Sequence, residues 1–142
     1  MNPVTKNPQG ESGSANSSAM HLFEHGRLSY VQIPAIDVRD SAKFYEKVFG
    51  WKVRGDGMNH LSFTDATGEM IGAWVTGRAV SREPGVLPYI YIYVHGIDAI
   101  LERVTASDGE IVTSPYPEGD LWVATFRDPA GNVIGVWQQG PR

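Results

Sequence analysis

Hydrophobic and polar residues alternate over residues 30–33, which predicts a β-strand with one buried face. The apolar positions then change to a helical spacing. They are Ala42, Phe44, Tyr45, Val48 and Phe49. We therefore predict a helix over residues 41–49, capped at its start by Asp37 or Asp40 and ended by Gly50.

The order of predicted elements occurs twice along the chain. After the first helix, β-forming residues predict short strands at 51–54, 60–64 and 70–75. The second half predicts a strand over 89–94, a helix over 97–106, and strands near Ile111, at 122–127 and at 133–138. This order predicts an α+β fold in which two βαβββ modules pair into curved mixed sheets around a cleft. Module one spans 28–76, a Pro-containing linker spans 77–88, and module two spans 89–139.

A sequence repeat supports the two-module interpretation. FTDATGEMIGAW at 63–74 and FRDPAGNVIGVW at 126–137 share six identical positions. Such a long-range repeat is typical of two copies of one supersecondary unit. Asp65 and Asp128 recur within it, and we expect both to hold the turns between the strands that flank them.

The first part of the chain differs in composition from the rest. Residues 1–25 are rich in Asn, Ser, Gly and Pro, and we expect a disordered tail there, followed by a single domain over 26–142. The tail lacks the pattern of a signal peptide, and no apolar run is long enough for a membrane span. We expect a cytoplasmic protein without a membrane partner.

Charge and cysteine content exclude several classes of function. The chain has 12 Lys and Arg against 16 Asp and Glu, a formal net charge of -4, which argues against a nucleic-acid partner. It has no cysteine, which excludes disulfides, thiolate nucleophiles and zinc-finger sites. A small molecule is the expected partner.

Two segments carry a resemblance to a known family. IPAIDVRDSAKFYEKVFGW at 33–51 and FRDPAGNVIGVWQ at 126–138 are similar to the vicinal oxygen chelate superfamily, which includes glyoxalase I, the bleomycin-resistance proteins and extradiol dioxygenases. The resemblance covers 28–139 and implies the same two-module fold. It also implies a homodimer, as do the half-open sheets that each module would present.

The family's metal enzymes place His or Glu ligands on the first and last strands of each module. Carried over to this chain, those positions are Tyr30, Gly72, Tyr89 or Tyr91, and Gly135. None of these residues is a usual ligand of a divalent ion. We therefore expect no metal and no other cofactor.

The same positions predict which side chains face the cleft, because side chains alternate along a strand. The predicted ligand-binding residues are Tyr30, Gln32, Met70, Gly72, Trp74, Tyr89, Tyr91, Tyr93, Gly135 and Trp137. Aromatic walls suit planar or amphipathic ligands, and the two glycines would leave floor space between them. The alternative is that these aromatic residues form a dimer interface or fill the cleft themselves.

Candidates for acid–base chemistry are few. His60 could face the cleft with Glu69, Glu118 or Asp120 as a partner, and the alternative is a solvent-facing His60. The first hypothesis is therefore a metal-free protein that binds an aromatic or amphipathic compound for sequestration, resistance or carriage. The second is a glyoxalase-like isomerase or lyase in which Tyr30, Gln32 and His60 polarise a carbonyl. A third is a domain that binds only another protein.

Overall fold

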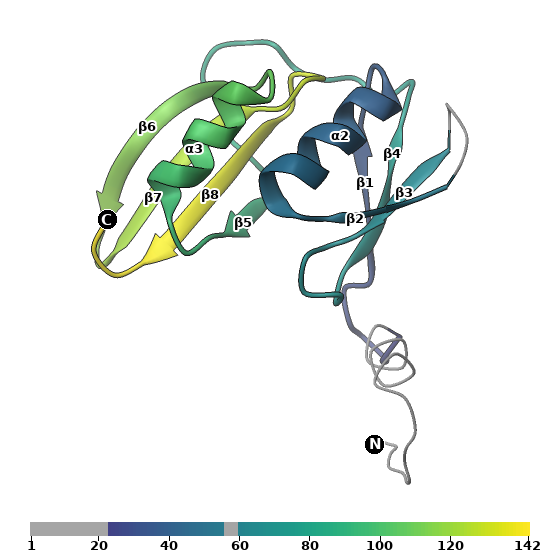
Figure 1. Cartoon of the computed structure of the whole chain (residues 1–142), viewed down its shortest axis with the longest axis horizontal. Helices are drawn as coiled ribbons and strands as arrows, with labels where there is room; N and C mark the ends of the chain where they lie inside the picture. Colours follow the sequence, from purple (N-terminus) through teal and green to yellow (C-terminus); the bar gives the residue numbers. More distant parts are fainter. Residues whose placement is uncertain (1–22, 56–59) are drawn as a thin grey trace, which may run out of the picture.

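The computed structural model describes residues 23–55 and 60–142, so most of the predicted tail lies outside the described residues. Module one forms a four-stranded sheet, sheet A, in the order β1-β4-β3-β2 (Figure 1). Its strands are β1 (Tyr30–Pro34), β2 (Lys52–Arg54), β3 (Leu61–Thr64) and β4 (Ile71–Val75). The β1 and β4 strands are parallel, and the other two pairs are antiparallel.

Module two forms a second sheet, sheet B, with the corresponding order β5-β8-β7-β6. Its strands are β5 (Tyr91–Tyr93), β6 (Glu110–Glu118), β7 (Leu121–Arg127) and β8 (Val133–Gln139). The β5 and β8 strands are parallel, as β1 and β4 are in sheet A, and the remaining pairs are antiparallel. The predicted α+β fold of two βαβββ modules with mixed sheets is confirmed.

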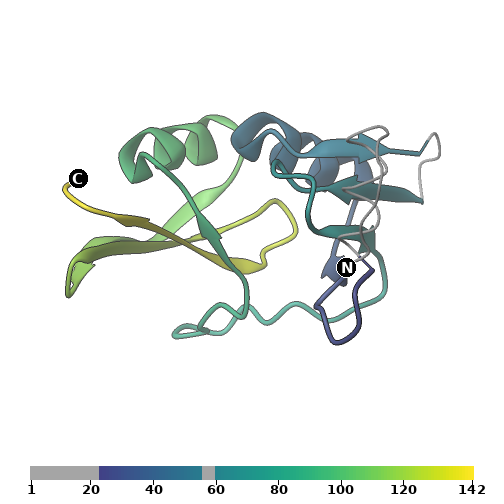
Figure 2. The same cartoon turned by 90° about the horizontal axis from the view of Figure 1, so that it is seen from below.

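Each module carries one helix, α2 (Val38–Phe49) or α3 (Ile97–Ala106). Asp37 is the N-cap of α2, because its side chain accepts hydrogen bonds from two backbone N–H groups of the first turn. Gly50 ends α2 with a positive φ of 74°, a conformation that glycine adopts without strain. Both helices lie on the same side of the molecule (Figure 2). We call the sheet face that packs on a helix the helix face and the other the open face.

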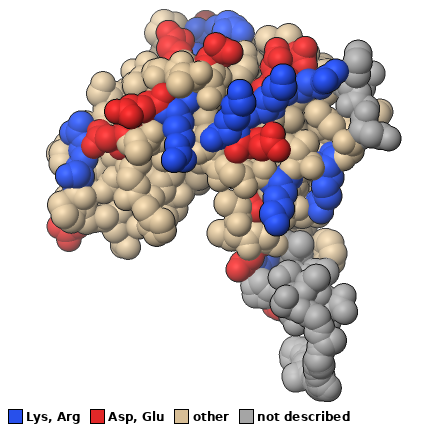
Figure 3. Space-filling model, viewed as in Figure 1, with Lys and Arg blue, Asp and Glu red and all other residues tan. Residues whose placement is uncertain are grey.

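One hydrophobic core runs beneath both helices. Phe44 and Tyr45 of α2 pack on Phe126 of β7 and on Trp51 and Trp74 of module one. Acidic and basic side chains interleave on the surface seen in Figure 3, so this face has no extended basic area. Among the described helices, none is long and apolar enough to cross a membrane.

A buried polar contact joins the two modules. The Tyr45 hydroxyl of α2 donates to Asp128 Oδ2 at 2.7 Å, and Asn132 Nδ2 donates to the Pro34 carbonyl at 2.7 Å. Burial raises the pKa of the Tyr45 hydroxyl well above its ordinary value, and the adjacent Asp128 raises it further. The hydroxyl therefore remains a hydrogen-bond donor between the modules.

Candidate functional site

The open face of sheet B is aromatic. Tyr91 pairs with Gly135 and Tyr93 pairs with Trp137 in the parallel β5–β8 ladder, so these side chains share one face. Ile92 and Val136 alternate with them and point to the helix face. The alternation predicted for module two is therefore confirmed, and Tyr93 and Trp137 meet edge to face with ring centroids 4.7 Å apart.

Sheet A differs, and the predicted face of its last strand is wrong. In β4, Gly72 pairs with Val31 and Trp74 pairs with Ile33, so both lie on the helix face. Trp74 is 1% exposed and packs against the Phe63 ring within the core, where a ligand cannot reach it. Tyr30 and Gln32 lie on the other face, the open face of sheet A, beside Ile71 and Ala73.

A one-residue difference in a turn explains the reversal. In module one the backbone N–H of Asp65 bonds to the Met70 carbonyl, with four residues between them. In module two the N–H of Asp128 bonds to the Asn132 carbonyl, with three residues between them. The register shift places Phe63 opposite Gly72 but Phe126 opposite Ile134. A shift of one residue moves every side chain of the last strand to the other face.

The predicted floor space at the two glycines is also wrong, because aromatic rings fill it. A Cβ at Gly72 would lie 2.5 Å from the Phe63 ring and 2.2 Å from the Val31 carbonyl oxygen. A Cβ at Gly135 would lie 2.4 Å from the Tyr91 ring. The glycines allow these rings to lie close against the sheets.

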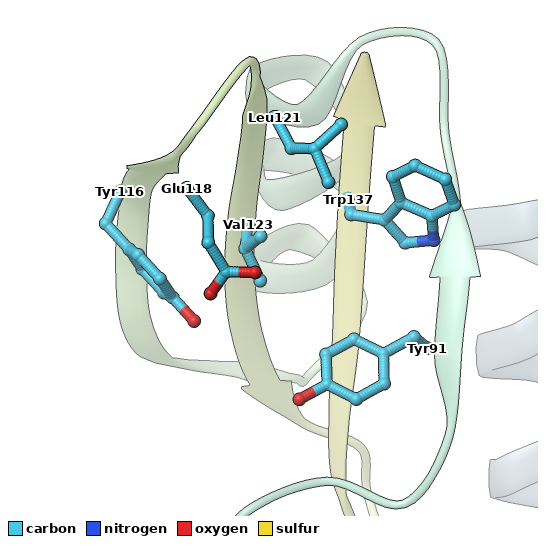
Figure 4. A pocket seen from close by; sticks show the side chains of 6 residues that line it. All are labelled: Tyr91, Tyr116, Glu118, Leu121, Val123 and Trp137. Carbon is cyan, nitrogen blue, oxygen red and sulfur yellow. The ribbon is translucent and has the colours of Figure 1, made fainter.

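A pocket of about 260 Å³ lies on the open face of sheet B (Figure 4). It is lined by Tyr91, Tyr116, Glu118, Leu121, Val123 and Trp137. The β8 and β5 strands supply Trp137 and Tyr91, which the sequence predicted as ligand-binding residues. The other four come from β6 and β7. The sequence suggested Glu118 only as a possible partner of His60, and it did not place Tyr116, Leu121 or Val123 at a ligand site.

Most of the β6 strand was not predicted, because prolines interrupt its sequence. It runs from Glu110 to Glu118 through Pro115 and Pro117, whereas the sequence predicted only a short strand near Ile111. An edge strand tolerates proline because its outward N–H groups need no partner. An irregularity in the pairing with β7 lies between Thr113 and Tyr116. Beyond it, Tyr116 and Glu118 stand two residues apart and reach the same pocket.

The phenol and carboxylate groups of this pocket interact electrostatically. Partial burial raises the pKa of the Tyr116 hydroxyl, and the Glu118 carboxylate and the Tyr91 hydroxyl raise it further. The Tyr116 hydroxyl is therefore protonated at neutral pH and can donate a hydrogen bond.

A larger cavity of about 970 Å³, which we call the intermodule groove, lies between the two modules. Its walls include the edge strand β1 and the C-terminal end of α2 on one side, and β5 and the start of α3 on the other. Five of the predicted ligand-binding residues line it. They are Tyr30, Met70, Tyr89, Tyr91 and Tyr93. Tyr91 lines both the groove and the pocket on sheet B.

The remaining predicted residues lie outside both cavities. Gln32 is exposed and accepts a hydrogen bond from Arg78 of the linker. His60 is exposed just before β3, and no hydrogen bond joins it to Tyr30 or Gln32 among the described residues. Of the three side chains proposed to polarise a carbonyl, only Tyr30 lines one of the two cavities.

The structural role predicted for the two repeated aspartates is confirmed. Asp65 Oδ1 accepts hydrogen bonds from Thr67 Oγ1 and from the backbone of Glu69 and Met70. Asp128 Oδ1 accepts from the backbone N–H groups of residues 130, 131 and 132. Both side chains organise their turns.

The positions that the resemblance assigns to a metal do not fit one. Gly72 and Gly135 offer no side-chain donor, and aromatic rings fill the space beside them. Tyr30, Tyr89 and Tyr91 are phenols rather than the His or carboxylate ligands that divalent ions prefer. Over residues 23–55 and 60–142, no group of three or more His, Cys, Asp and Glu residues could hold an ion.

Comparison with known sequences identifies the family to which this α+β fold of two βαβββ modules belongs. The profile of the Glyoxalase/Bleomycin resistance protein/Dioxygenase superfamily matches residues 27–136. The chain belongs to this superfamily. A "Glyoxylase-like domain-containing protein" of Didymella fabae is 33% identical over 120 residues, covering 79% of this chain and 93% of the relative.

Two further relatives are associated with antibiotics. The anthracycline biosynthesis protein DnrV of Streptomyces peucetius is 27% identical over 139 residues, covering 85% of this chain and 50% of DnrV. The chain thus spans about half the length of curated relatives such as this one. The crystal structure of TnmS3, an antibiotic binding protein from Streptomyces sp. CB03234, matches the fold with a TM-score of 0.65 and 20% identity. It covers 83% of this chain and 99% of TnmS3.

Proposed function

We propose that this protein binds a planar or amphipathic small molecule in the pocket on the open face of sheet B, for sequestration, resistance or carriage. The observation that carries the proposal is the outward-facing aromatic set of Tyr91, Tyr116 and Trp137 around one cavity. Side chains of this kind stack on flat ligands and contribute about 0.5–1.5 kcal/mol per well-placed pair beyond the area they bury. The antibiotic-related relatives support a ligand of this class.

We also propose that binding is metal-free. Support comes from the glycines and phenols at the positions where the family's metal enzymes carry ligands. The ligand is then held by stacking, burial and hydrogen bonds, and its affinity should not change after chelation.

The intermodule groove supports the further proposal of a homodimer. β1 and β5 are both outer strands of their sheets, and each leaves one row of backbone groups unpaired. Large apolar side chains along and beside these edges are exposed, including Leu87 at 75% and Tyr89 at 100%. A second copy that packs on these edges would cover them and the groove.

A tryptophan fluorescence titration with planar aromatic compounds tests the binding site. We expect a saturable change in the full-length protein that is lost in Trp137→Phe and kept in Trp122→Phe. Trp122 is the matched control because it lies on β7 of the same sheet, paired with Gln138 on the helix face. Chelation with EDTA should leave the curve unchanged.

Two outcomes would count against these proposals. A signal that persists in Trp137→Phe and disappears in Trp122→Phe would move the site off the open face of sheet B. A loss of binding after EDTA treatment that is restored by added Zn²⁺, Ni²⁺, Mn²⁺ or Fe²⁺ would contradict metal-free binding.

A further inference from the structure

The pocket on sheet B has one charged lining residue among those the structure describes, and this residue is Glu118. No Lys, Arg or His accompanies it in the lining. Within residues 23–55 and 60–142, the side chain of Glu118 forms no hydrogen bond or ion pair. The negative charge of the pocket is therefore uncompensated by the protein itself.

The local structure directs this charge toward the aromatic side chains. Glu118 is the last residue of β6, and its neighbour Tyr116 projects from the same side of the strand. Figure 4 shows the Glu118 carboxylate and the hydroxyl groups of Tyr116 and Tyr91 pointing toward a common space above the sheet. The raised pKa of Tyr116, caused partly by Glu118 and Tyr91, agrees with this proximity.

The chemistry of this space selects a particular kind of ligand. A carboxylate repels anions and attracts cations, and Tyr and Trp ring faces attract cations through their π-electrons. Leu121 and Val123 supply an apolar floor between the polar tips and Trp137. A single carboxylate is too few donors for a bare divalent ion, which needs several. The combination suits an organic cation attached to a flat apolar group.

We propose that the ligand of this pocket is a planar compound bearing a protonated amine or a quaternary ammonium group, which lies between Glu118 and the rings of Tyr91 and Tyr116. This inference rests on the proposed function and adds the charge of the ligand to it. Glu118 sets the specificity for charge, and Trp137 with the apolar floor provides affinity for the flat portion.

Three acridines of nearly equal size and shape test the proposal. 9-Aminoacridine is a cation at neutral pH, acridine is largely neutral, and acridine-9-carboxylate is an anion. Calorimetric titration of the full-length protein should give the order cation, neutral, anion in decreasing affinity. The affinity for the cation should fall as ionic strength rises, and that for acridine should not.

The matched variants are Glu118→Gln and Glu110→Gln, which remove the same charge from two ends of β6. Glu110 lies outside the pocket lining. Glu118→Gln should weaken the affinity for the cation roughly fivefold, because a partly exposed ion pair contributes modestly to binding. The affinity for acridine should be unchanged. Glu110→Gln should change neither affinity.

The outcomes distinguish the proposal of a cationic ligand from the proposed binding of planar compounds in general. Equal affinities for all three compounds, with no effect of ionic strength, would overturn the cationic ligand and leave small-molecule binding in place. The titrations of the three compounds at several ionic strengths use the wild-type protein, so they test the charge preference even if a variant folds poorly. Binding of none of the three would overturn planar-compound binding in this pocket, and the cationic ligand with it.

Discussion

The buried hydroxyl of Tyr45 connects the two modules through a single side chain. It donates to Asp128, which also organises the β7–β8 turn through three backbone N–H groups. Without the hydroxyl, Asp128 Oδ2 keeps only the hydrogen bond that Asn132 Nδ2 donates. We expect Tyr45→Phe to lower the free energy of unfolding by about 1–3 kcal/mol, measured by urea denaturation. Tyr30→Phe, at an exposed tyrosine, is the control and should have little effect.

The same hydroxyl predicts a pH dependence with a definite sign. Its pKa is raised by burial and by Asp128, so the folded protein keeps a proton that the unfolded chain loses near pH 10. Stability contributed by Tyr45 is therefore present below about pH 10 and is lost as the pH rises above that value. Between neutral and strongly alkaline pH, the unfolding free energy should fall more steeply in the wild type than in Tyr45→Phe. Equal slopes would contradict this assignment.

At the scale of elements, β4 and β8 share the sequence Ile-Gly-x-Trp, but the corresponding residues of the two strands point to opposite faces of their sheets. Gly72 lies on the helix face with a backbone carbonyl beside it, and Gly135 lies on the open face, buried beneath the half-exposed ring of Tyr91. Gly72→Ala forces the Phe63 ring and the Val31 carbonyl to move, so it should cost at least about 2–3 kcal/mol. Gly135→Ala displaces only the Tyr91 ring and should cost less than about 1 kcal/mol.

The glycine pair also separates stability from ligand binding. Gly135→Ala should weaken the binding of planar compounds, because Tyr91 loses its position against the sheet. Thermal unfolding and the fluorescence titration measure the two effects on the same samples. Equal stability losses in the two variants would show that the registers of β4 and β8 do not differ as described.

The sequence predicted the elements well where local chemistry determines them. Gly50 marked the end of α2 and Asp37 was one of its two candidate N-caps, and the alternation in β5 and β8 placed Tyr91 and Trp137 on one face. It failed for Trp74, because the register of a hairpin depends on how its turn closes rather than on the strand's own residues. It failed for Tyr116 for a different reason, since prolines are weak evidence for a strand except at a sheet edge.

At the scale of the whole molecule, the unpaired edges β1 and β5 predict self-association. Leu87→Glu combined with Tyr89→Glu places charge on the most exposed apolar residues beside β5. If a second copy covers this edge, the double variant should weaken dimerisation about tenfold or more, as measured by sedimentation velocity. Val112→Glu, on the outer edge strand β6, is the control and should leave the dimer intact. A monomeric wild type at all concentrations would contradict the proposal.

The loops of the two hairpins differ in length by one residue, and this matters for how site residues are transferred between related proteins. An alignment by identity matches Trp74 to Trp137, although one side chain is sealed in the interior and the other borders solvent. The two repeats have the same number of residues, so a turn that closes one residue later can exchange the inner and outer sides of a strand with no insertion or deletion. The residue pair that closes the turn is then the variable through which evolution, or a designer, can change which face of a strand carries an aromatic side chain.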